Sequence, residues 1–539
     1  MILSDNSASL PSANVCIVGA GPVGLALALR LEALGLTVLL VEAGPLEALA
    51  SAIELISGHH ALPAVATHRG IGGTSALWGG RCVAFDDIDF ATRSHVPNSG
   101  WPIPHEQIKP YYREALRFLH AGDAPADPDA EPSQEDFAFT AIERWSRSPA
   151  LAPLYEERLM RSERVTLLTN TLVIGIGLDP AGDRVSHLRV RRHGEEHRLD
   201  VEQVVLAAGG LENARLLLEL QKAHPDKAGG ADGPLGRYYQ GHLTGYIALV
   251  HLSDPKLARE LSFQTDGQGN RLRRRLQPSP ALQNRECLLN TVFWLDAISI
   301  SDPAHRSGSL SLLYLLLAFS GTYRWVSRGL APRSGPGRRR DLAGHVRNLS
   351  LKGASFARVF QALKHLWKGS EDGTLANPAG RYLLRYHAEQ TPNAESRVLL
   401  RDDREGRAVL NVDYRVSESD VDSVLRTHQA LDKWLRERGA GQLEYLQDEA
   451  GSRRSVLAQA FDGYHQIGLT RMSDPHSGVV DGNCRVHGVA NLHLAGACVF
   501  PTGGHANPTL PAVALALRLA DHLANRLSDR ASGQASVTA

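Results

Sequence analysis

The stretch NVCIVGAGPVGLALALRLEALGLTVLLVE, residues 14–42, decides the fold of this chain. Two runs within it, 14–18 and 37–41, are apolar at nearly every position, and a glycine turn and a segment with helical apolar spacing lie between them. Such continuous apolar runs suit parallel strands that helices cover on both faces. The stretch therefore predicts the first strand–helix–strand unit of an α/β domain.

The turn in this unit has the pattern G-x-G-x-x-G, formed by Gly19, Gly21 and Gly24. The first glycine allows a tight turn, the second lets a pyrophosphate approach the backbone, and the third lets helix and strand pack closely. Glu42 ends the second strand, where a carboxylate accepts hydrogen bonds from ribose hydroxyls. Together these residues predict a dinucleotide site. The alternative, a tight turn in an α/β core that binds no ligand, does not explain why the three glycines and the terminal Glu42 occur together.

Two features outside the turn favour FAD over NAD as the dinucleotide. The chain does not continue with further strand–helix units but enters the glycine-rich stretch GGTSALWGG at 72–80. A distant strand at 492–500 again ends in glycine and proline before a helix. This arrangement predicts an extended cofactor enclosed by both ends of the chain.

Composition excludes several classes of function. The chain has 539 residues, of which 43% are hydrophobic and 22% charged, with a formal net charge of zero, so nucleic-acid binding is not indicated. Its five cysteines form no C-x-x-C pair, which argues against a disulfide scaffold or a metal site and for a reducing compartment. No apolar run reaches the roughly 18 residues that a membrane span needs. We expect a cytoplasmic protein without a metal ion.

The length favours about two to four domains. We expect the fold class to be α/β, with a Rossmann-like FAD-binding domain built from discontinuous segments and a substrate-binding domain with helices and a mostly antiparallel sheet. Helices are predicted over 106–119, 420–439 and 511–526 from their apolar spacing. The predicted domain boundaries are 1–95, 164–240 and 450–530 for the FAD-binding domain, and 96–163 and 241–449 for the substrate-binding domain.

Four blocks of the sequence resemble the glucose–methanol–choline (GMC) oxidoreductase family: 18–44, 70–80, 204–218 and 491–523. Within that family the ending N-P-T-L, in GGHANPTL, is most similar to the pyranose oxidase-type and bacterial sugar-oxidising branch. The resemblance implies a catalytic His and Asn at the flavin, which match His465 in YHQIGLTRM and Asn507 in GGHANPTL.

The implied roles agree with the chemistry of alcohol oxidation. A neutral imidazole accepts the hydroxyl proton, so His465 is the expected base, and the amide of Asn507 holds the same oxygen. FAD supplies the hydride acceptor, flavin N5. His505 is the rival histidine; we expect it either to line the substrate pocket or to cap the last helix.

The resemblance also implies the residues that contact FAD. Thr74, Ser75 and Trp78 border the isoalloxazine, although ordinary core packing also accounts for Trp78. Val173 contacts adenine through its backbone, Gly496 and Ala497 approach the pyrophosphate, and Pro508 and Thr509 lie near the pyrimidine edge. Some relatives attach flavin covalently through a His at the position of Leu77, so this chain is expected to bind FAD noncovalently. The remaining expected cofactor residues are Gly19, Gly21, Pro22, Gly24, Glu42, Ala43, Gly72, Gly73, Gly79 and Gly80.

A basic insert at about 301–375 does not match the family. Between Gly321 and Lys368 eleven Lys or Arg residues stand against a single acid, Asp341. Three interpretations remain open: a surface lid or oligomer contact, peripheral docking on an anionic membrane, and recognition of an acidic substrate by arginines such as 338–340.

These observations predict an FAD-dependent oxidoreductase that oxidises a hydroxyl of a sugar, glycoside or related polyol to a carbonyl. The electron acceptor is oxygen, a quinone or a protein. The alternatives are a quinone- or protein-linked alcohol dehydrogenase at a membrane surface, a flavin-containing lyase of the same family, and a flavin-binding protein without catalysis.

Overall fold

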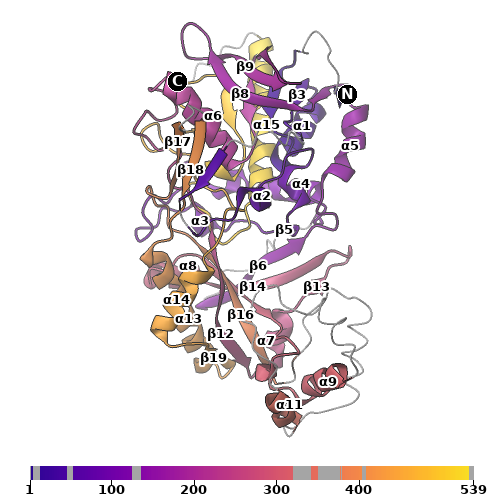
Figure 1. Ribbon diagram of the computed structural model, residues 1–539, viewed down its shortest axis with the longest axis vertical. Helices are drawn as coiled ribbons and strands as arrows, with labels where there is room; N and C mark the ends of the chain where they lie inside the picture. Colours follow the sequence, from indigo (N-terminus) through magenta and orange to yellow (C-terminus); the bar gives the residue numbers. More distant parts are fainter. Residues whose placement is uncertain are drawn as a thin grey trace.

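The computed structural model describes residues 2–3, 12–44, 52–56, 58–123, 135–319, 342–349, 377, 379–402 and 408–532. Most of the predicted basic insert, including 338–340, lies outside the described residues. The strands form two large sheets and two small ones, and both chain ends lie in the upper part of the molecule in Figure 1.

The first large sheet is parallel throughout and joins segments from across the chain. Its first strand–helix–strand unit is the predicted one, in which β2 (Val15–Val18) precedes and β3 (Val38–Val41) follows α1 (Pro22–Ala33). Valine and leucine fill these strands, and their side chains are almost entirely buried on both faces, as expected for a covered parallel sheet. In order across the sheet the strands are β1 (Ile2–Leu3), β7 (Val165–Leu168), β3 (Val38–Val41), β2 (Val15–Val18), β11 (Val204–Leu206) and β20 (Leu492–Leu494).

Two helices from opposite ends of the chain lie side by side near this sheet. They are α1 (Pro22–Ala33) and α15 (Thr509–Ala531), and their contact places the glycine turn and the C-terminal segment together. The guanidinium of Arg30 binds both carboxylate oxygens of Asp521, at 2.8 and 3.1 Å. The half of the molecule that is predicted to bind FAD is therefore assembled from discontinuous segments.

The second large sheet is antiparallel and lies in the lower part of Figure 1. One of its faces packs against α13 (Glu418–Glu437) and α14 (Glu449–Gln459) through apolar side chains such as Phe293 and Tyr386. Because side chains alternate along a strand, the neighbouring Trp294 and His387 point to the opposite face. In order, its strands are β19 (Gly441–Tyr445), β12 (His242–Leu252), β16 (Arg381–Glu389), β15 (Thr291–Asp296), β14 (Arg271–Pro278), β6 (Phe137–Trp145) and β5 (Arg81–Cys82).

The remaining elements complete the two halves. β8 (Thr171–Leu178), β9 (Val185–Arg192) and β10 (Glu195–Asp200) form one small sheet; β4 (Ala52–Leu55), β17 (Arg397–Asp402) and β18 (Ala408–Asp413) form the other, and β13 (Gln264–Thr265) pairs with β14. The other described α-helices are α2 (Pro63–Ala66), α3 (Asp87–Phe90), α4 (Tyr112–Phe118), α5 (Ala152–Arg161), α6 (Gly210–Ala223), α7 (Pro255–Glu260), α8 (Pro280–Arg285), α9 (Gly308–Phe319) and α11 (Leu342–Leu349).

The fold confirms the predicted class, and the helices predicted over 420–439 and 511–526 correspond to α13 and α15. The helix predicted over 106–119 is wrong in its first half. Pro110 lacks an N–H and disfavours helix in the residue before it, so two short 3₁₀ turns, His105–Gln107 and Lys109–Tyr111, precede α4. The exact domain boundaries stay a prediction. Among the helices that the structure describes, none has the length and apolar character to cross a membrane.

Candidate active site

The glycine turn has the geometry that a dinucleotide needs. Gly19 has a φ of +103°, and a Cβ there would lie 2.6 Å from the carbonyl oxygen of Ala207. A Cβ on Gly24 would lie 1.9 Å from the Gly19 oxygen, so helix and turn touch directly. A Cβ on Gly21 would meet nothing within 4 Å. The backbone at Gly21 therefore faces open space at the N-terminus of α1, where a phosphate fits.

The side chain of Glu42 is hydrogen-bonded to the backbone at three positions near this turn. Its carboxylate accepts the backbone N–H groups of Ala20 (2.8 Å), Gly44 (3.0 Å) and Gly70 (2.9 Å). A carboxylate has about four lone-pair sites, so one remains for a ribose hydroxyl. Ala43, the next predicted cofactor residue, is half-buried.

The glycine-rich stretch folds directly onto the turn. The N–H of Gly72 donates to the Ala20 oxygen at 2.8 Å, and a Cβ on Gly73 would lie 2.9 Å from the Cα of Gly21. The first helical position after the turn is Pro22, which needs no hydrogen-bond partner for its nitrogen. These contacts place the two glycine motifs side by side, as an extended cofactor requires.

The residues of the glycine-rich stretch differ in their exposure and in their hydrogen bonds. Ser75 is buried and donates to the Gly72 oxygen at 2.6 Å, and Trp78 is half-buried and donates to the Pro149 oxygen at 2.7 Å. Thr74, Leu77 and Gly79 are exposed, whereas Gly80 is buried. The exposed positions are available to a ligand, while Ser75 and Trp78 make internal hydrogen bonds.

Four of the remaining predicted cofactor residues lie at element ends, and the fifth, Val173, lies within β8. Gly496 and Ala497 follow β20 and are half-buried, and Pro508 and Thr509 begin α15. The first turn of α15 carries no acidic residue, so its dipole presents partial positive charge there. The carbonyl of Val173 accepts a hydrogen bond from Arg215 at 3.3 Å.

His465 and Asn507 are brought together. The amide nitrogen of Asn507 lies 3.5 Å from Nε2 of His465, although the residues are 42 positions apart. On the other side of the ring, Nδ1 of His465 lies 3.0 Å from Asp462 Oδ2 and 2.9 Å from His242 Nδ1. The imidazole of His465 is one-fifth exposed, so a ligand has access to it.

The groups beside Nδ1 of His465 determine which of its two ring nitrogens carries the proton. The Nε2 of His242 lies 3.1 Å from the Gly504 carbonyl, which only accepts, so His242 carries its proton on Nε2. Its Nδ1 is then an acceptor like the Asp462 carboxylate. With two acceptors at its Nδ1, neutral His465 is protonated there, and Nε2 is a free base facing Asn507.

Asp462 is held ionised in this position. Burial raises the pKa of its carboxyl, but the charge and hydrogen bond of His465 outweigh burial and leave that pKa well below its ordinary value. The carboxylate also accepts the backbone N–H groups of His242 (2.7 Å), Gly463 (2.7 Å), Tyr464 (2.9 Å) and His465 (3.0 Å). It thus fixes the loop and stabilises positive charge on His465.

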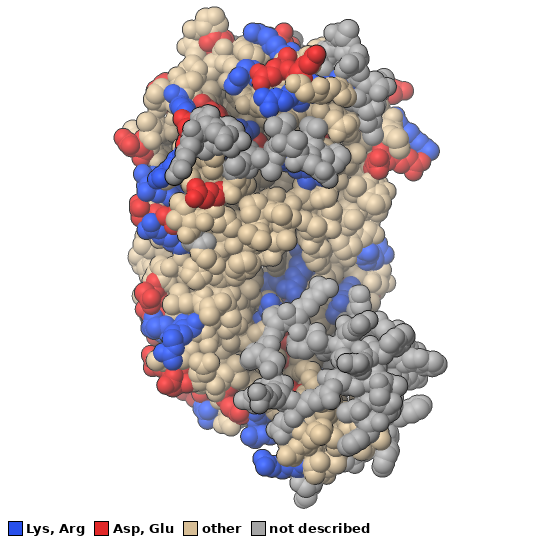
Figure 2. All heavy atoms as spheres, in the orientation of Figure 1, with Lys and Arg blue, Asp and Glu red and all other residues tan. Residues whose placement is uncertain are grey.

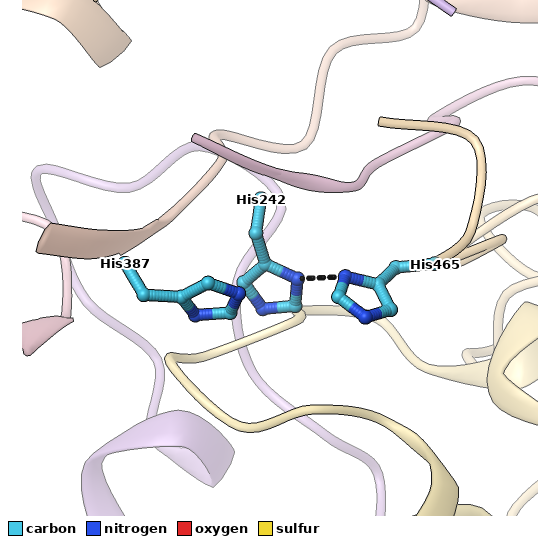
Figure 3. A group of neighbouring side chains, drawn as sticks. All are labelled: His242, His387 and His465. Atoms are coloured by element: carbon cyan, nitrogen blue, oxygen red, sulfur yellow. Dashed lines mark hydrogen bonds between the residues drawn. The ribbon is translucent and has the colours of Figure 1, made fainter. Parts of the chain in front are cut away.

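Three imidazoles, of His242, His387 and His465, gather at this point (Figure 3), with one nitrogen of each within 4.8 Å of the others. Burial, followed by the charge of His465, lowers the pKa of His242 to about 3, and burial holds the pKa of His387 well below its usual range. The rings of His242 and His387 are stacked, with centroids 4.2 Å apart and planes at 22°. A metal ion bound through ring nitrogens lies close to each ring plane, and two stacked rings do not share such a point. The cluster therefore consists of His465, the neutral His242 hydrogen-bonded to it, and the neutral His387 stacked on His242.

Asn507 is oriented by a buried ion-pair network. Its Oδ1 accepts a hydrogen bond from Arg275 at 2.9 Å, which turns its amide nitrogen toward His465. Arg275 also binds Glu143 at 2.9 Å, and Arg273 binds the other oxygen of Glu143 at 2.5 Å. These three charged side chains are buried and keep the amide in one orientation.

His505 is fully buried, and its Nε2 lies 2.8 Å from Asp86 Oδ2. Its backbone carbonyl, not its ring, faces the site and accepts hydrogen bonds from Arg275 (3.2 Å) and His387 (3.1 Å). The alternative that His505 caps the last helix is wrong, because the start of α15 has no side-chain cap.

Sequence reasoning missed Asp462, His242, His387, Arg275 and Glu143. Asp462 stands three residues before His465, and an acid this close to a proposed base was a signal available in the sequence. The other four lie on strands far away in the chain and carry no local signature.

Comparisons with known proteins identify related oxidoreductases. A family model described as "FAD dependent oxidoreductase" matches residues 14–228, and one described as "GMC oxidoreductase" matches residues 392–516. The 6'''-hydroxyparomomycin C oxidase of Streptomyces lividus is 26% identical over 94% of this chain and 90% of its own. The paromamine 6'-oxidase of Streptomyces fradiae is 32% identical over 24% of this chain and 23% of its own.

Solved structures show the same fold at low identity. The pyridoxine 4-oxidase from Mesorbium loti has a TM-score of 0.52 and 18% identity, covering 95% of this chain and 99% of its own. A fungal aryl-alcohol oxidase has a TM-score of 0.53 and 15% identity, covering 97% and 100%.

The fold and the glycine cradle thus define an FAD-dependent oxidoreductase. The C-terminal segment, residues 392–516, which contains both His465 and Asn507, matches the GMC oxidoreductase family.

Proposed function

We propose that this protein oxidises a hydroxyl of a sugar, glycoside or related polyol to a carbonyl, with His465 as the base. The observation that carries the proposal is the arrangement around His465: two acceptors at Nδ1, and an unprotonated Nε2 beside the Asn507 amide. The names of the two Streptomyces relatives, oxidases of 6'''-hydroxyparomomycin C and paromamine, support an alcohol on a sugar-like compound.

Each residue of the site has a separate role in the proposed oxidation. Nε2 of His465 accepts the hydroxyl proton, while the Asn507 amide donates a hydrogen bond to the same oxygen and holds it in place. Asp462 stabilises the imidazolium that forms, and the neutral His242 adds no competing charge. FAD, when bound, supplies the hydride acceptor.

Noncovalent binding of FAD is part of the proposal. Leu77 occupies the position from which some relatives attach flavin, and its side chain forms no such bond; it is about half exposed. Acid precipitation should release all flavin from the polypeptide. Flavin that remained in the pellet after denaturation would contradict noncovalent binding.

The test is anaerobic reduction of the flavin by a panel of sugars, glycosides and aliphatic or aromatic alcohols. His465→Ala should abolish bleaching of the flavin absorbance while FAD stays bound. His476→Ala is the matched control, because His476 is exposed on a loop and touches none of the site residues above, and it should reduce at the wild-type rate. Full-rate reduction by His465→Ala would show that another group is the base.

A further inference from the structure

Four arginines surround one buried tryptophan on the polar face of the antiparallel sheet. The guanidinium carbons of Arg273, Arg275, Arg81 and Arg385 lie 4.6, 5.1, 5.4 and 5.9 Å from the ring centre of Trp294. We call these four side chains the arginine face. They come from β14, β5 and β16 and are adjacent through the register of the sheet.

The arginine face is continuous with the reacting groups. Arg275 donates to Asn507 Oδ1 at 2.9 Å. Arg385 stands two residues before His387 on β16, so the two side chains share a face about 7 Å apart along the strand. His387 stacks on His242, whose Nδ1 meets His465. These contacts connect Arg385 to His465 through His387, whose ring centre lies 5.9 Å from that of His465.

Positive charge on this face exceeds negative charge. Among the described residues, the acids that form ion pairs with it are Glu143 and Asp296. Glu143 binds Arg273 and Arg275 and lies 3.4 Å from Arg81, and Asp296 lies 3.7 Å from Arg385 and 4.0 Å from Arg273. Counted over these described ion-paired groups, four guanidinium groups and two carboxylates leave a formal charge of +2. Burial, together with the charges of Arg81 and Arg275, lowers the pKa of Arg273 to about 10 although Glu143 raises it.

Two members of the face are open to a ligand. The side chains of Arg81 and Arg385 are 35% and 27% exposed, while Arg273 and Arg275 are buried behind them. Figure 2 shows Lys and Arg side chains gathered in a recess at mid-height of the molecule, over the region where Figure 1 places β5 and β6. The half-buried Tyr246 lies beside them and donates its hydroxyl to Asp296 at 2.5 Å.

We propose that the substrate carries an acidic group, a carboxylate or a phosphate, which Arg385 and Arg81 bind while the hydroxyl to be oxidised lies between His465 and Asn507. This inference rests on the proposed function and names its substrate class. A planar guanidinium binds carboxylate or phosphate oxygens with paired hydrogen bonds, and the surplus charge favours an anion over a neutral or cationic polyol.

Binding is tested first, without turnover. The FAD-loaded protein is titrated with acetate and, separately, with inorganic phosphate, and perturbation of the flavin absorbance and of the melting temperature is recorded. The wild type should bind at least one anion, and Arg385→Gln should weaken that binding on the order of 10-fold or more, the loss expected for a charge-assisted hydrogen bond. Whichever anion binds more tightly identifies the acidic group as carboxylate or phosphate.

A matched control separates the site from general charge effects. Arg161→Gln removes the same charge from α5, where the side chain is 80% exposed and pairs only with Glu157 among the described residues. It should bind both anions like the wild type. Equal anion binding by the wild type and Arg385→Gln, or binding by neither, overturns the inference.

Turnover then separates this inference from the proposed function. Glucuronate, glucose 6-phosphate, glucose and glucosamine form a matched panel of acidic, neutral and cationic sugars. An acidic sugar should show the lowest apparent KM of the panel. The KM for that sugar should rise in Arg385→Gln and at high ionic strength. If Arg385→Gln instead slowed flavin reduction equally for every sugar and left anion binding unchanged, the arginines would stabilise the reduced flavin electrostatically. In that case the proposed substrate class would be wrong. If anions bind through Arg385 but no alcohol bleaches the flavin, the proposed oxidation fails while the anion site stands.

Discussion

Replacing Asp462 by Asn tests whether the carboxylate orients and stabilises the base. The carboxylate accepts four backbone N–H groups and lies 3.0 Å from Nδ1 of His465. An amide has one acceptor oxygen in place of two and no charge, so the bond to His465 loses its ionic character. A charge-assisted hydrogen bond contributes about 1.5–3 kcal/mol.

That contribution appears only as the hydroxyl proton arrives on His465. Because each 1.36 kcal/mol changes a rate tenfold, Asp462→Asn should slow flavin reduction by about 10- to 100-fold, with little change in substrate affinity. The loss should be smaller than that in His465→Ala, because general-base catalysis as a whole contributes about 10²–10⁴-fold. Without the carboxylate the imidazolium is less stable, so the acid limb of the pH–rate profile should move to lower pH.

The assay is anaerobic stopped-flow reduction of the bound flavin at saturating alcohol over a range of pH. Flavin content and melting temperature show whether the variant is folded. Asp474→Asn, an exposed aspartate on a loop of the same segment, is the control and should behave as the wild type. A folded Asp462→Asn protein with full flavin content and the wild-type rate and pH profile would refute the assigned role.

Two further predictions follow from the glycine turn and from a buried acid. Gly21→Ala should weaken FAD binding without changing the melting temperature of the apoprotein, because its Cβ enters open space. Gly24→Ala should lower that melting temperature, because its Cβ would lie 1.9 Å from the Gly19 oxygen. FAD affinity is measured by fluorescence titration, and equal affinity in Gly21→Ala and the wild type would contradict the first expectation. Burial and the charge of Asp86 raise the pKa of Asp89 from 3.8 to about 7, so the folded state holds its proton more tightly and the free energy of unfolding should fall as pH rises from about 4 to 7. Asp89→Asn should flatten this part of the denaturant-measured profile, and an unchanged slope would exclude Asp89 as its source.

Much of the nucleotide-binding half could be predicted from the sequence because its signals are local. The apolar runs at 14–18 and 37–41, the spacing of Gly19, Gly21 and Gly24, and the position of Glu42 lie within one short stretch, and each has a direct geometric meaning. The prediction that His465 and Asn507 are catalytic also came from the sequence, but only through the resemblance to a family, because a lone histidine has no chemical signature.

The tertiary structure alone decided what surrounds those two residues. His242 meets His465 across 223 positions and Arg275 meets Asn507 across 232, because the register of an antiparallel sheet and the packing of the two halves set these contacts. The tautomer of His465 follows from these contacts, because acceptors at one ring nitrogen determine where the proton lies and which nitrogen remains free. The positive surplus of the arginine face has the same origin, since side chains from three strands sum their charge only when the sheet places them around Trp294.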